Sequence, residues 1–408
     1  MIEGLARFDT PTGFAVGVNS VTATLNNRKQ TLVDLGVINK IGLQQDGIRF
    51  TDDGSLVVGG MALAEINATL EKRGLGKLTI IPTSTFRRAM GRKYVDLCET
   101  AVKVINPAPI PRFLGDKAMQ YWELYDTALA VPPWQPIDYY LSDGGEPTMD
   151  ALAEDFIADA PLVLKARAST QGRGIWFYPG GVDGFLEDWA TDAAPDPFLD
   201  APEQFLLQYA VPHRYDKRVI AAGRTPISGE NRFGDPNTDK SNLNIVDTGA
   251  STLRDATATL LERGAVEPMD MPGVDPAVER AVADLHDELA ALAAQSSDRL
   301  HTWIGWDLLV VDPDDSRLEA VPDDVLQGLL KERYRTERGE YLVFGEGNLS
   351  PGSKERYVNA LTRGREGLRW DSAANLLAYG RSVSRSGPFE PGIPDLIDRE
   401  ALANRYGL

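Results

Sequence analysis

The sequence predicts an α/β protein, with α+β character in part, that is built from more than one domain. Its 408 residues exceed the length at which a single hydrophobic core stops growing. Short apolar runs typical of strands alternate with stretches of helical periodicity. Apolar residues make up 43% and charged residues 25% of the chain, close to the globular average. We therefore expect a folded chain with two or three cores.

The first 112 residues are expected to form an α/β domain. Short apolar runs at 14–18, 55–58 and 78–81 are typical of buried strands, and 61–72 has the three- and four-residue apolar spacing of a helix. The proline-rich segment 103–111 should end this domain, because proline disfavours helix in the residue before it.

Residues 113–207 are expected to form a small central domain. Residues 116–130 have the pattern of a helix with Asp116 near its start. Two apolar, strand-like runs at 162–166 and 174–178 then enclose a polar, glycine-bearing stretch, which predicts a hairpin with a flexible tip.

Residues 208–408 are expected to form a larger domain of mixed strands and helices. A strand at 205–211 leads into this domain, and further strands are expected at 217–223, 302–311 and 341–348. A helix should begin at Asp275, because a proline follows this typical N-cap residue. Its apolar stripe predicts a buried face made of Val278, Val282, Leu285, Leu289 and Leu292. The charged stretch before the last strand should contain an inserted helix around 323–335.

A lysine in the first run of the predicted hairpin suggests an anion site. Lys165 lies among apolar residues, where an ammonium is costly to bury without an anionic partner. The small residues that follow, including Gly172 and Gly174, would let backbone N–H groups approach a phosphate. Since most glycine-rich turns are simple hairpins, it is the lysine and glycines together that predict a nucleotide-phosphate clamp.

Three oxygen-bearing side chains predict a divalent metal site. Glu346 and Asn348 are two residues apart on a predicted strand, so they should point to the same face. Asp307 lies on a strand that could pair beside them. Such donors suit Mg²⁺, which also takes water and substrate phosphates as ligands. The alternative is that they are ordinary surface residues of an acid-rich chain.

The chain is strongly acidic, with 60 acidic against 42 basic residues, a net charge of −18 and a pI near 4.7. This charge argues against nucleic acid as a partner, because it repels phosphate polymers. Only 12 of the basic residues are lysines. Many carboxylates with few lysines are typical of the salt-adapted surface of a halophilic protein, although an ordinary acidic bacterial protein is the alternative.

The remaining chemically active residues form no recognisable site. Cys98, the only cysteine, has no identifiable base and is expected to be a buried small residue. His213, His286 and His301 lack the spacing of zinc ligands. The first residues lack the features of a signal peptide, and no apolar run approaches about 20 residues, so we expect a cytoplasmic protein with no membrane partner.

Five segments occur in the order seen in ATP-grasp ligases, and the stretch from about Asn106 to Gly352 resembles that superfamily, most of all its RimK-type carboxylate–amine (glutamate) ligases. The segments are 161–174, 216–219, 240–249, 305–307 and 346–352. The resemblance implies a three-part architecture. Residues 1–112 would be the N-terminal α/β (pre-ATP-grasp) domain, 113–207 a small central lid domain with a glycine-rich loop, and 208–408 a larger C-terminal domain with the metal site.

The resemblance also implies site residues, with ATP and Mg²⁺ as cofactors and Mn²⁺ as a substitute for Mg²⁺. Nucleotide phosphates would be bound by Lys117, Lys165 and the lid glycines Gly172 and Gly174. The strand lining the adenine would contribute Gln208, Tyr209 and Val211. The acyl phosphate or acidic substrate would be held by Arg218, Arg232 and Asn242. The metal ligands would be Asp307, Glu346 and Asn348.

Two departures from the family pattern affect these expectations. Tyr209 stands where an acidic residue is usual, which affects adenine binding little because that role is largely the backbone's. The interval from Asp307 to Glu346 is long and implies an insertion, so Glu319 competes as a metal ligand.

The expected activity is ATP- and Mg²⁺-dependent joining of a carboxylate to an amine through an acyl phosphate. The substrates would be small molecules or peptides, and one form of the reaction would add an amino acid to a peptide or protein. Two alternatives stay open: a D-Ala-D-Ala-type amino-acid ligase, and a nucleotide-binding regulatory or assembly protein without turnover. A homo-oligomer is compatible with the sequence.

Overall fold

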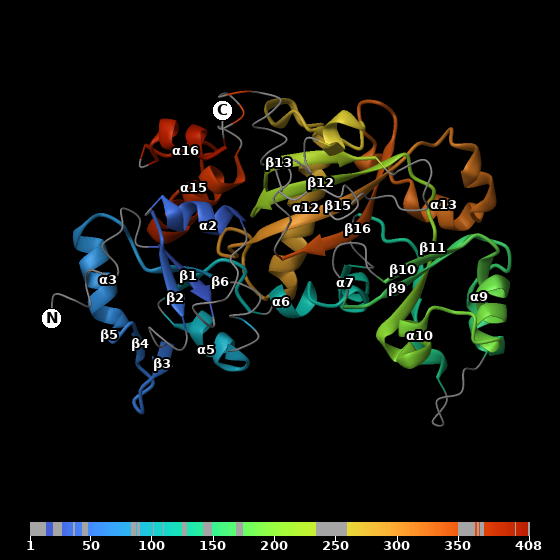
Figure 1. Ribbon diagram of the computed structural model, residues 1–408, viewed down its shortest axis with the longest axis horizontal. Coiled ribbons are helices and arrows are strands. Elements are labelled where there is room, and N and C mark those ends of the chain that lie inside the picture. Colours follow the sequence, from blue (N-terminus) through green and yellow to red (C-terminus); the bar gives the residue numbers. More distant parts are fainter. Residues whose placement is uncertain are drawn as a thin grey trace.

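The computed structural model describes residues 14–18, 27–35, 37–42, 48–82, 87, 90–100, 102–108, 110–124, 129–141, 149–168, 174–233, 259–349, 364, 367, 371–395 and 397–406. The fold is mixed α/β, as expected (Figure 1). None of the helices in these ranges has the length and hydrophobicity that a bilayer span requires.

The N-terminal sheet is parallel, with strand order β2 (Asn39–Gly42), β1 (Phe14–Val18), β6 (Thr79–Pro82) and β7 (Lys103–Val104). Strand β6 is buried on both faces, because Ile80 and Ile81 belong to different cores. Ile80 packs in a core with α3 (Leu63–Lys72), α5 (Lys93–Glu99) and the antiparallel strands β3 (Ile48–Phe50), β4 (Leu56–Val58) and β5 (Met61–Ala62).

The other face of that sheet is covered by helices distant in sequence. Ile81 packs with α2 (Asn27–Asp34) and with α15 (Ser372–Arg385) and α16 (Arg399–Tyr406), which come from the end of the chain. Figure 1 shows these last two helices (red) above the N-terminal sheet (blue). The domain division at residues 112 and 207 stays a prediction, and these helices would cross it.

The central sheet is antiparallel, with strand order β10 (Ile175–Tyr178), β9 (Leu162–Ala166), β11 (Phe205–Tyr209) and β8 (Trp134–Pro136). Alternate residues face opposite sides: Leu164 and Leu207 pack into a local core, whereas Leu206 packs toward the C-terminal body. The local core is closed by η1 (Ile137–Tyr140), α8 (Met149–Asp155), α9 (Gly181–Ala190) and α10 (Asp196–Asp200), and the short turn η2 (Pro202–Gln204) leads into β11.

The C-terminal sheet is also antiparallel, with strand order β14 (Val266–Pro268), β13 (Thr225–Arg232), β12 (Tyr215–Ala222), β15 (Trp303–Val311) and β16 (Tyr341–Asn348). One face packs through Val219 and Trp306 against α12 (Pro276–Leu292), α6 (Ile110–Phe113) and α7 (Lys117–Leu124). Residues one position along, such as Arg218 and Asp307, must therefore face the other way.

Several expected helices differ in extent. Helix α12 begins as predicted, with Asp275 accepting a hydrogen bond from the Ala277 N–H at 2.8 Å. Helix α7 is described only to Leu124, and 125–128 lie outside the described residues. The inserted helix is shorter than expected: α13 (Asp323–Leu329) ends first, and 332–334 form a separate turn, η6 (Glu332–Tyr334). The remaining short turns are η4 (Met271–Gly273) and η5 (Ser316–Ala320).

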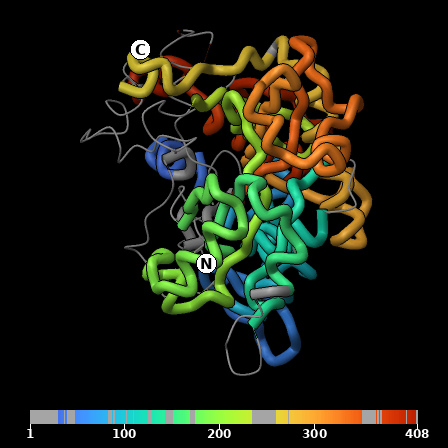
Figure 2. The backbone as a smooth tube through the Cα atoms, turned by 90° about the vertical axis from the view of Figure 1, so that its right-hand side faces the viewer, coloured from blue at the N-terminus to red at the C-terminus, as the bar shows by residue number. Residues whose placement is uncertain are grey.

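The central and C-terminal sheets meet at one end of the molecule. In Figure 2 the central segment (green) and the α13 region (orange) face the viewer together. Strand β11 links the two parts, since it belongs to the central sheet while its Leu206 packs into the core of the C-terminal body. At this junction Lys165 on β9 is near enough to Glu346 on β16 for their charges to interact.

Candidate active site

Lys165 lies on the face of the central sheet that is turned toward the C-terminal body. Its Nζ donates to Gln208 Oε1 at 2.6 Å and lies 3.4 Å from the Tyr121 hydroxyl. Gln208 is itself fixed, because its Nε2 donates to the Pro132 carbonyl at 3.0 Å. The ammonium thus has a neutral amide as its close partner, which leaves its charge available to an anion.

The pKa of Lys165 falls to about 8, because burial disfavours the ammonium. The nearby Lys117 lowers the pKa further, and Glu346 opposes both effects. A phosphate group beside the two lysines would reverse this shift, since opposite charge favours the protonated form.

Lys117 reaches the same place from a different element. It is the first residue of α7, its side chain is 6% exposed, and its Nζ lies 3.5 Å from Glu346 Oε2. The Nζ also donates to the Ala166 carbonyl, at 3.5 Å, on the strand that carries Lys165. The structure therefore brings together two lysines that are 48 positions apart in the sequence.

The three predicted metal ligands also converge. Asp307 and Glu346 are directly paired across β15 and β16. The Asn348 Nδ2 lies 3.1 Å from Glu346 Oε1 and 3.3 Å from Asp307 Oδ2. Glu319 is exposed on η5, outside the two paired strands. Their roles as ligands stay predictions.

A bulge and a buried glutamine shape the strand that carries Glu346 and Asn348. The pairing register shifts after Asp307, and a side chain at Gly345 would come within 2.7 Å of the Asp307 carbonyl oxygen. The side-chain amide of Gln120 makes two hydrogen bonds to the backbone of Gly347. Its Oε1 accepts from the Gly347 N–H at 2.8 Å, and its Nε2 donates to the Gly347 carbonyl at 3.2 Å. These contacts fix the direction of the acidic side chains.

Two arginines on the same face bind Asp307. Arg218 makes a two-point contact with it, at 2.7 Å and 2.5 Å, and Arg232 Nη2 lies 3.1 Å away. Burial alone would raise the pKa of Asp307, but the two guanidiniums outweigh burial and hold this pKa well below its usual range. Arg232 also pairs with Asp216, whose pKa burial raises to about 6.

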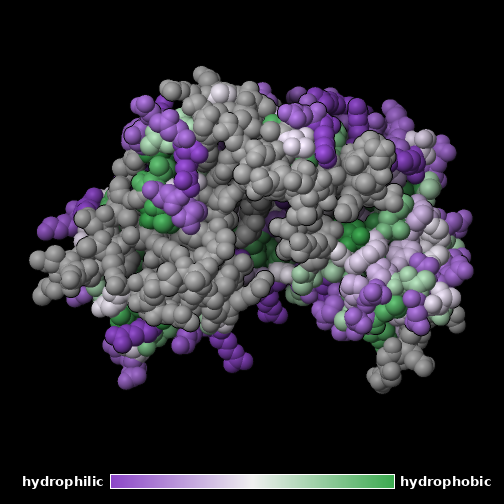
Figure 3. Space-filling view, in the orientation of Figure 1, coloured by the Kyte–Doolittle hydropathy of each residue, from purple (hydrophilic) through white to green (hydrophobic). Residues whose placement is uncertain are grey.

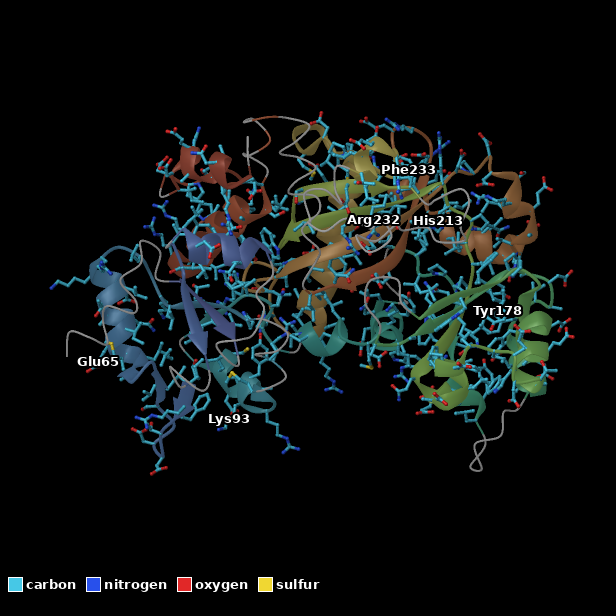
Figure 4. All side chains as sticks on the ribbon, in the orientation of Figure 1. Glu65, Lys93, Tyr178, His213, Arg232 and Phe233 are labelled. Atoms are coloured by element: carbon cyan, nitrogen blue, oxygen red, sulfur yellow. The ribbon has the colours of Figure 1, made fainter. Side chains whose placement is uncertain are left out.

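One guanidinium atom of this cluster is free. Arg232 is 2% exposed, and its buried Nη1 has no hydrogen-bond partner in the structure as described. A buried donor without a partner costs free energy, so an oxygen ligand at this point would be stabilising. Figure 4 labels Arg232 in the C-terminal sheet, higher in the view than Tyr178 of the central sheet.

The acidic cluster fits Mg²⁺ in the kind of donors it offers. The described residues contain no group of three His, Cys, Asp or Glu arranged for a metal, so the amide of Asn348 would have to serve as the third donor. Turning that amide by 180° would bring its oxygen toward the two carboxylates. Asp307 already accepts from both arginines, so Glu346 and Asn348 are the more available pair.

Other predicted site residues are less directly placed. Tyr209 points into the core of the central sheet, where its hydroxyl accepts from the Ile157 N–H at 2.9 Å, so only its backbone could contact a nucleotide. Val211 is buried in a separate core with Val311 and Val343. Gly174 has a positive φ of 74°, as a tight turn requires. Gly172, Asn242 and the expected flexible hairpin tip lie outside the described residues.

Sequence reasoning missed several residues near this candidate site. Ile175 and Phe177, each 44% exposed, pair with Lys165 and Val163 and so lie on the same sheet face as Lys165. Alternation along β10 could have identified them. Tyr121, one helical turn after Lys117, donates to the Gly345 carbonyl at 2.9 Å.

The chain is similar in structure to ATP-grasp ligases. One is the ATP-grasp ligase PsnB complexed with minimal precursor, at 13% identity and a TM-score of 0.49, covering 91% of this chain and 99% of that chain. Another is the D-cycloserine synthetase DcsG, at 13% identity and a TM-score of 0.48, covering 96% and 99%.

A third similar structure is the RimK domain protein ATP-grasp from Sphaerobacter thermophilus, at 13% identity and a TM-score of 0.42, covering 91% of this chain and 98% of that chain. No family model matches the sequence, and no curated protein matches it significantly. Likeness at this level does not establish an activity, so the function is inferred from the side chains themselves.

Proposed function

We propose that this chain is an ATP-grasp enzyme, an ATP- and Mg²⁺-dependent ligase that joins a carboxylate to an amine through an acyl phosphate. The observation that carries the proposal is the convergence of Lys117 and Lys165 beside Glu346, with Asn348 and Asp307 adjoining. Cationic groups for phosphates and oxygen donors for a divalent metal thus lie next to one another.

The nucleotide is bound by the face of the central sheet that carries Lys165. Lys165 and Lys117 bind its phosphates, which supply the anionic partner that Gln208 does not. Ile175 and Phe177, exposed on the same face, offer apolar surface for the base. Gly172 and Gly174 would cover the phosphates with backbone N–H groups.

Mg²⁺, or Mn²⁺ in its place, would be held by Glu346 and Asn348, with Asp307 as the third oxygen donor. When bound, such a cation neutralises charge on the nucleotide phosphates. The protein itself fixes the direction of these donor side chains, through the bulge at Gly345 and the hydrogen bonds of Gln120 to the Gly347 backbone.

Arg218 and Arg232 hold the substrate carboxylate, with Asn242 assigned to the same role. A carboxylate oxygen attacks the γ-phosphorus of ATP, the bond to the bridging oxygen breaks, and ADP leaves. The amine then attacks the acyl carbon of the mixed anhydride, and inorganic phosphate leaves with the formation of an amide. Both steps depend on positioning and charge stabilisation, so no protein nucleophile is required.

The substrates proposed are a small-molecule or peptide carboxylate and an amine. An ADP-release screen over amino acids and short acidic peptides, at low and at molar KCl, tests turnover and substrate class together. We expect ADP release that requires both a carboxylate and an amine. Purified protein that neither binds Mg·ATP nor releases ADP with any substrate pair would contradict the proposal.

A further inference from the structure

Arg167 connects the central sheet to the start of the helix that carries Lys117. It follows β9 directly, two residues after Lys165. Its Nε lies 3.2 Å from both Asp116 carboxylate oxygens, and its Nη2 donates to Asp116 Oδ2 at 2.9 Å. Its Nη1 donates to Asp138 Oδ2 on η1 at 3.1 Å and to the Glu203 carbonyl on η2 at 3.4 Å.

Asp116 has a second task at the start of α7. Its Oδ1 accepts from the Ala118 N–H at 2.8 Å, which makes it the N-cap of the helix whose first residue is Lys117. The backbone adds a further link, because the Lys117 N–H donates to the Arg167 carbonyl at 2.9 Å. Arg167 therefore helps to place Lys117 in two ways, through its side chain, which binds Asp116, and through its backbone carbonyl, which binds the Lys117 N–H.

The two parts joined by this contact belong to different cores. Helix α7 packs through Ala118 and Tyr121 with the C-terminal sheet, whereas β9 packs through Leu164 with the central sheet. Lys117 and Lys165 thus sit on separate bodies. Their relative placement depends on contacts across the junction, and the Arg167–Asp116 pair is a two-point ionic contact at that place.

Resting on the proposed function, we propose that Arg167 is a positioning residue, which together with Asp116 holds Lys117 in register with Lys165 so that both reach the same phosphate chain. Arg167 itself binds no nucleotide, since its guanidinium is directed to Asp116, Asp138 and the Glu203 carbonyl. Its loss should weaken nucleotide binding through Lys117 while the cores of both bodies remain folded.

The test uses two variants that remove the pair in different ways. Arg167→Gln removes the guanidinium. Asp116→Asn removes the charge yet keeps the N-cap, because asparagine caps helices as well as aspartate does. The matched control is Arg333→Gln, since Arg333 on η6 makes a similar two-point contact with Asp284 on α12, at 2.9 Å and 2.9 Å, and neither residue contacts Lys117 or Lys165.

Two measurements are made on each full-length protein. Calorimetric titration gives the affinity for a non-hydrolysable ATP analogue with Mg²⁺. Trace acetylation without nucleotide, read by mass spectrometry, gives the reactivity of Lys117 relative to the exposed Lys72. We expect both pair variants to bind the analogue about threefold to tenfold more weakly, the size of a charged contact reduced by partial exposure. Lys117 should become more reactive in both, and the control should match wild type.

The two readouts separate this inference from the proposed function. Wild-type reactivity of Lys117 and wild-type affinity in both pair variants would overturn the positioning role. A wild-type protein that binds no analogue would instead overturn the nucleotide site, and the acetylation ratio would still decide whether Arg167 places Lys117. If Arg167→Gln does not fold, Asp116→Asn decides alone.

Discussion

Two lysines in this protein have similar hydrogen-bond and ring contacts but different charged neighbours. Lys165 donates to the amide of Gln208 at 2.6 Å and lies 5.7 Å from the ring centre of Tyr121. Lys217 donates to the amide of Asn231 at 3.0 Å and lies 5.0 Å from the ring centre of Tyr215. Burial lowers the pKa of both.

The difference lies in the charges around them. Burial lowers the pKa of Lys217, and Arg338 lowers it further, but the acidic Glu340, Asp275 and Glu267 raise it, so the charged neighbours of Lys217 are mostly acidic. Lys165 has another cation, Lys117, as its strongest charged neighbour. We therefore expect a buried lysine beside an amide and a ring to be structural when its charged neighbours are carboxylates. When its main charged neighbour is a second lysine, we expect it to be open to an anionic ligand.

Replacing each lysine by alanine should give the largest difference in ATP turnover between the two environments. Lys165→Ala is expected to lower ATP turnover by about 100-fold or more, because it removes a charge that acts on the transferring phosphoryl group. Lys117→Ala should have a similar but smaller effect. Lys217→Ala should leave turnover within about twofold of wild type. Steady-state ADP release measures all three, with circular dichroism to confirm folding. Equal turnover in the Lys165 and Lys217 variants would remove the distinction between the two lysines.

Substitution of the two acidic residues of the cluster should affect the free energy of unfolding to different extents. Asp307→Asn leaves Arg218 and Arg232 without their shared carboxylate, and we expect it to lower the free energy of unfolding by about 2–4 kcal/mol. Glu346→Gln should change that free energy by less than about 1 kcal/mol, because Glu346 is more exposed and its closest charged partner lies at 3.5 Å.

Urea unfolding gives both free energies, and each variant should lose Mg²⁺-dependent turnover. A Glu346→Gln protein that retains full turnover at limiting Mg²⁺ would contradict its assignment as a metal donor.

Binding of nucleotide should depend on pH through Lys165. Its pKa of about 8 means that the ammonium is present below this pH and is lost as the pH rises through it. The affinity for Mg·ATP should therefore fall as the pH rises above about 8, whereas Lys165→Met, which cannot titrate, should bind weakly at every pH. Calorimetric titration from pH 6.5 to 9.5 measures this dependence. A wild-type affinity that is flat over this range would contradict the open charge of Lys165.

The smallest effect concerns the surface as a whole. Hydrophilic residues cover much of the described surface on the face shown in Figure 3, in keeping with the net charge of −18. If the chain is salt-adapted, its melting temperature should rise between low and molar KCl, because salt screens the repulsion between carboxylates. Thermal melts in KCl and in sucrose of equal osmolality separate screening from excluded-solute effects. A flat or falling melting temperature in KCl would leave the acidic composition unexplained.

The residues of the candidate site could be predicted from the sequence more completely than the contacts that hold them in place. Alternation along a strand was enough to predict that Glu346 and Asn348 share a face, and an apolar strand around Lys165 was enough to single it out. By contrast, Gln120 hydrogen-bonds to Gly347, which is 227 positions away in the sequence, and no local sequence pattern predicts this contact. The Arg167–Asp116 pair was missed for the same reason. The helix predicted over 323–335 failed at its end, since charge and periodicity alone do not mark where α13 stops.

The most direct test of the central claim is calorimetric titration of a non-hydrolysable ATP analogue with Mg²⁺ into wild type, Lys165→Ala, Glu346→Gln and Lys217→Ala. The claim is that the two lysines and the acidic cluster form one nucleotide site. It predicts single-site binding in wild type and Lys217→Ala, and binding at least about tenfold weaker in Lys165→Ala and Glu346→Gln, with the Glu346 effect disappearing when Mg²⁺ is omitted. No binding to wild type, or equal binding to all four proteins, would contradict it.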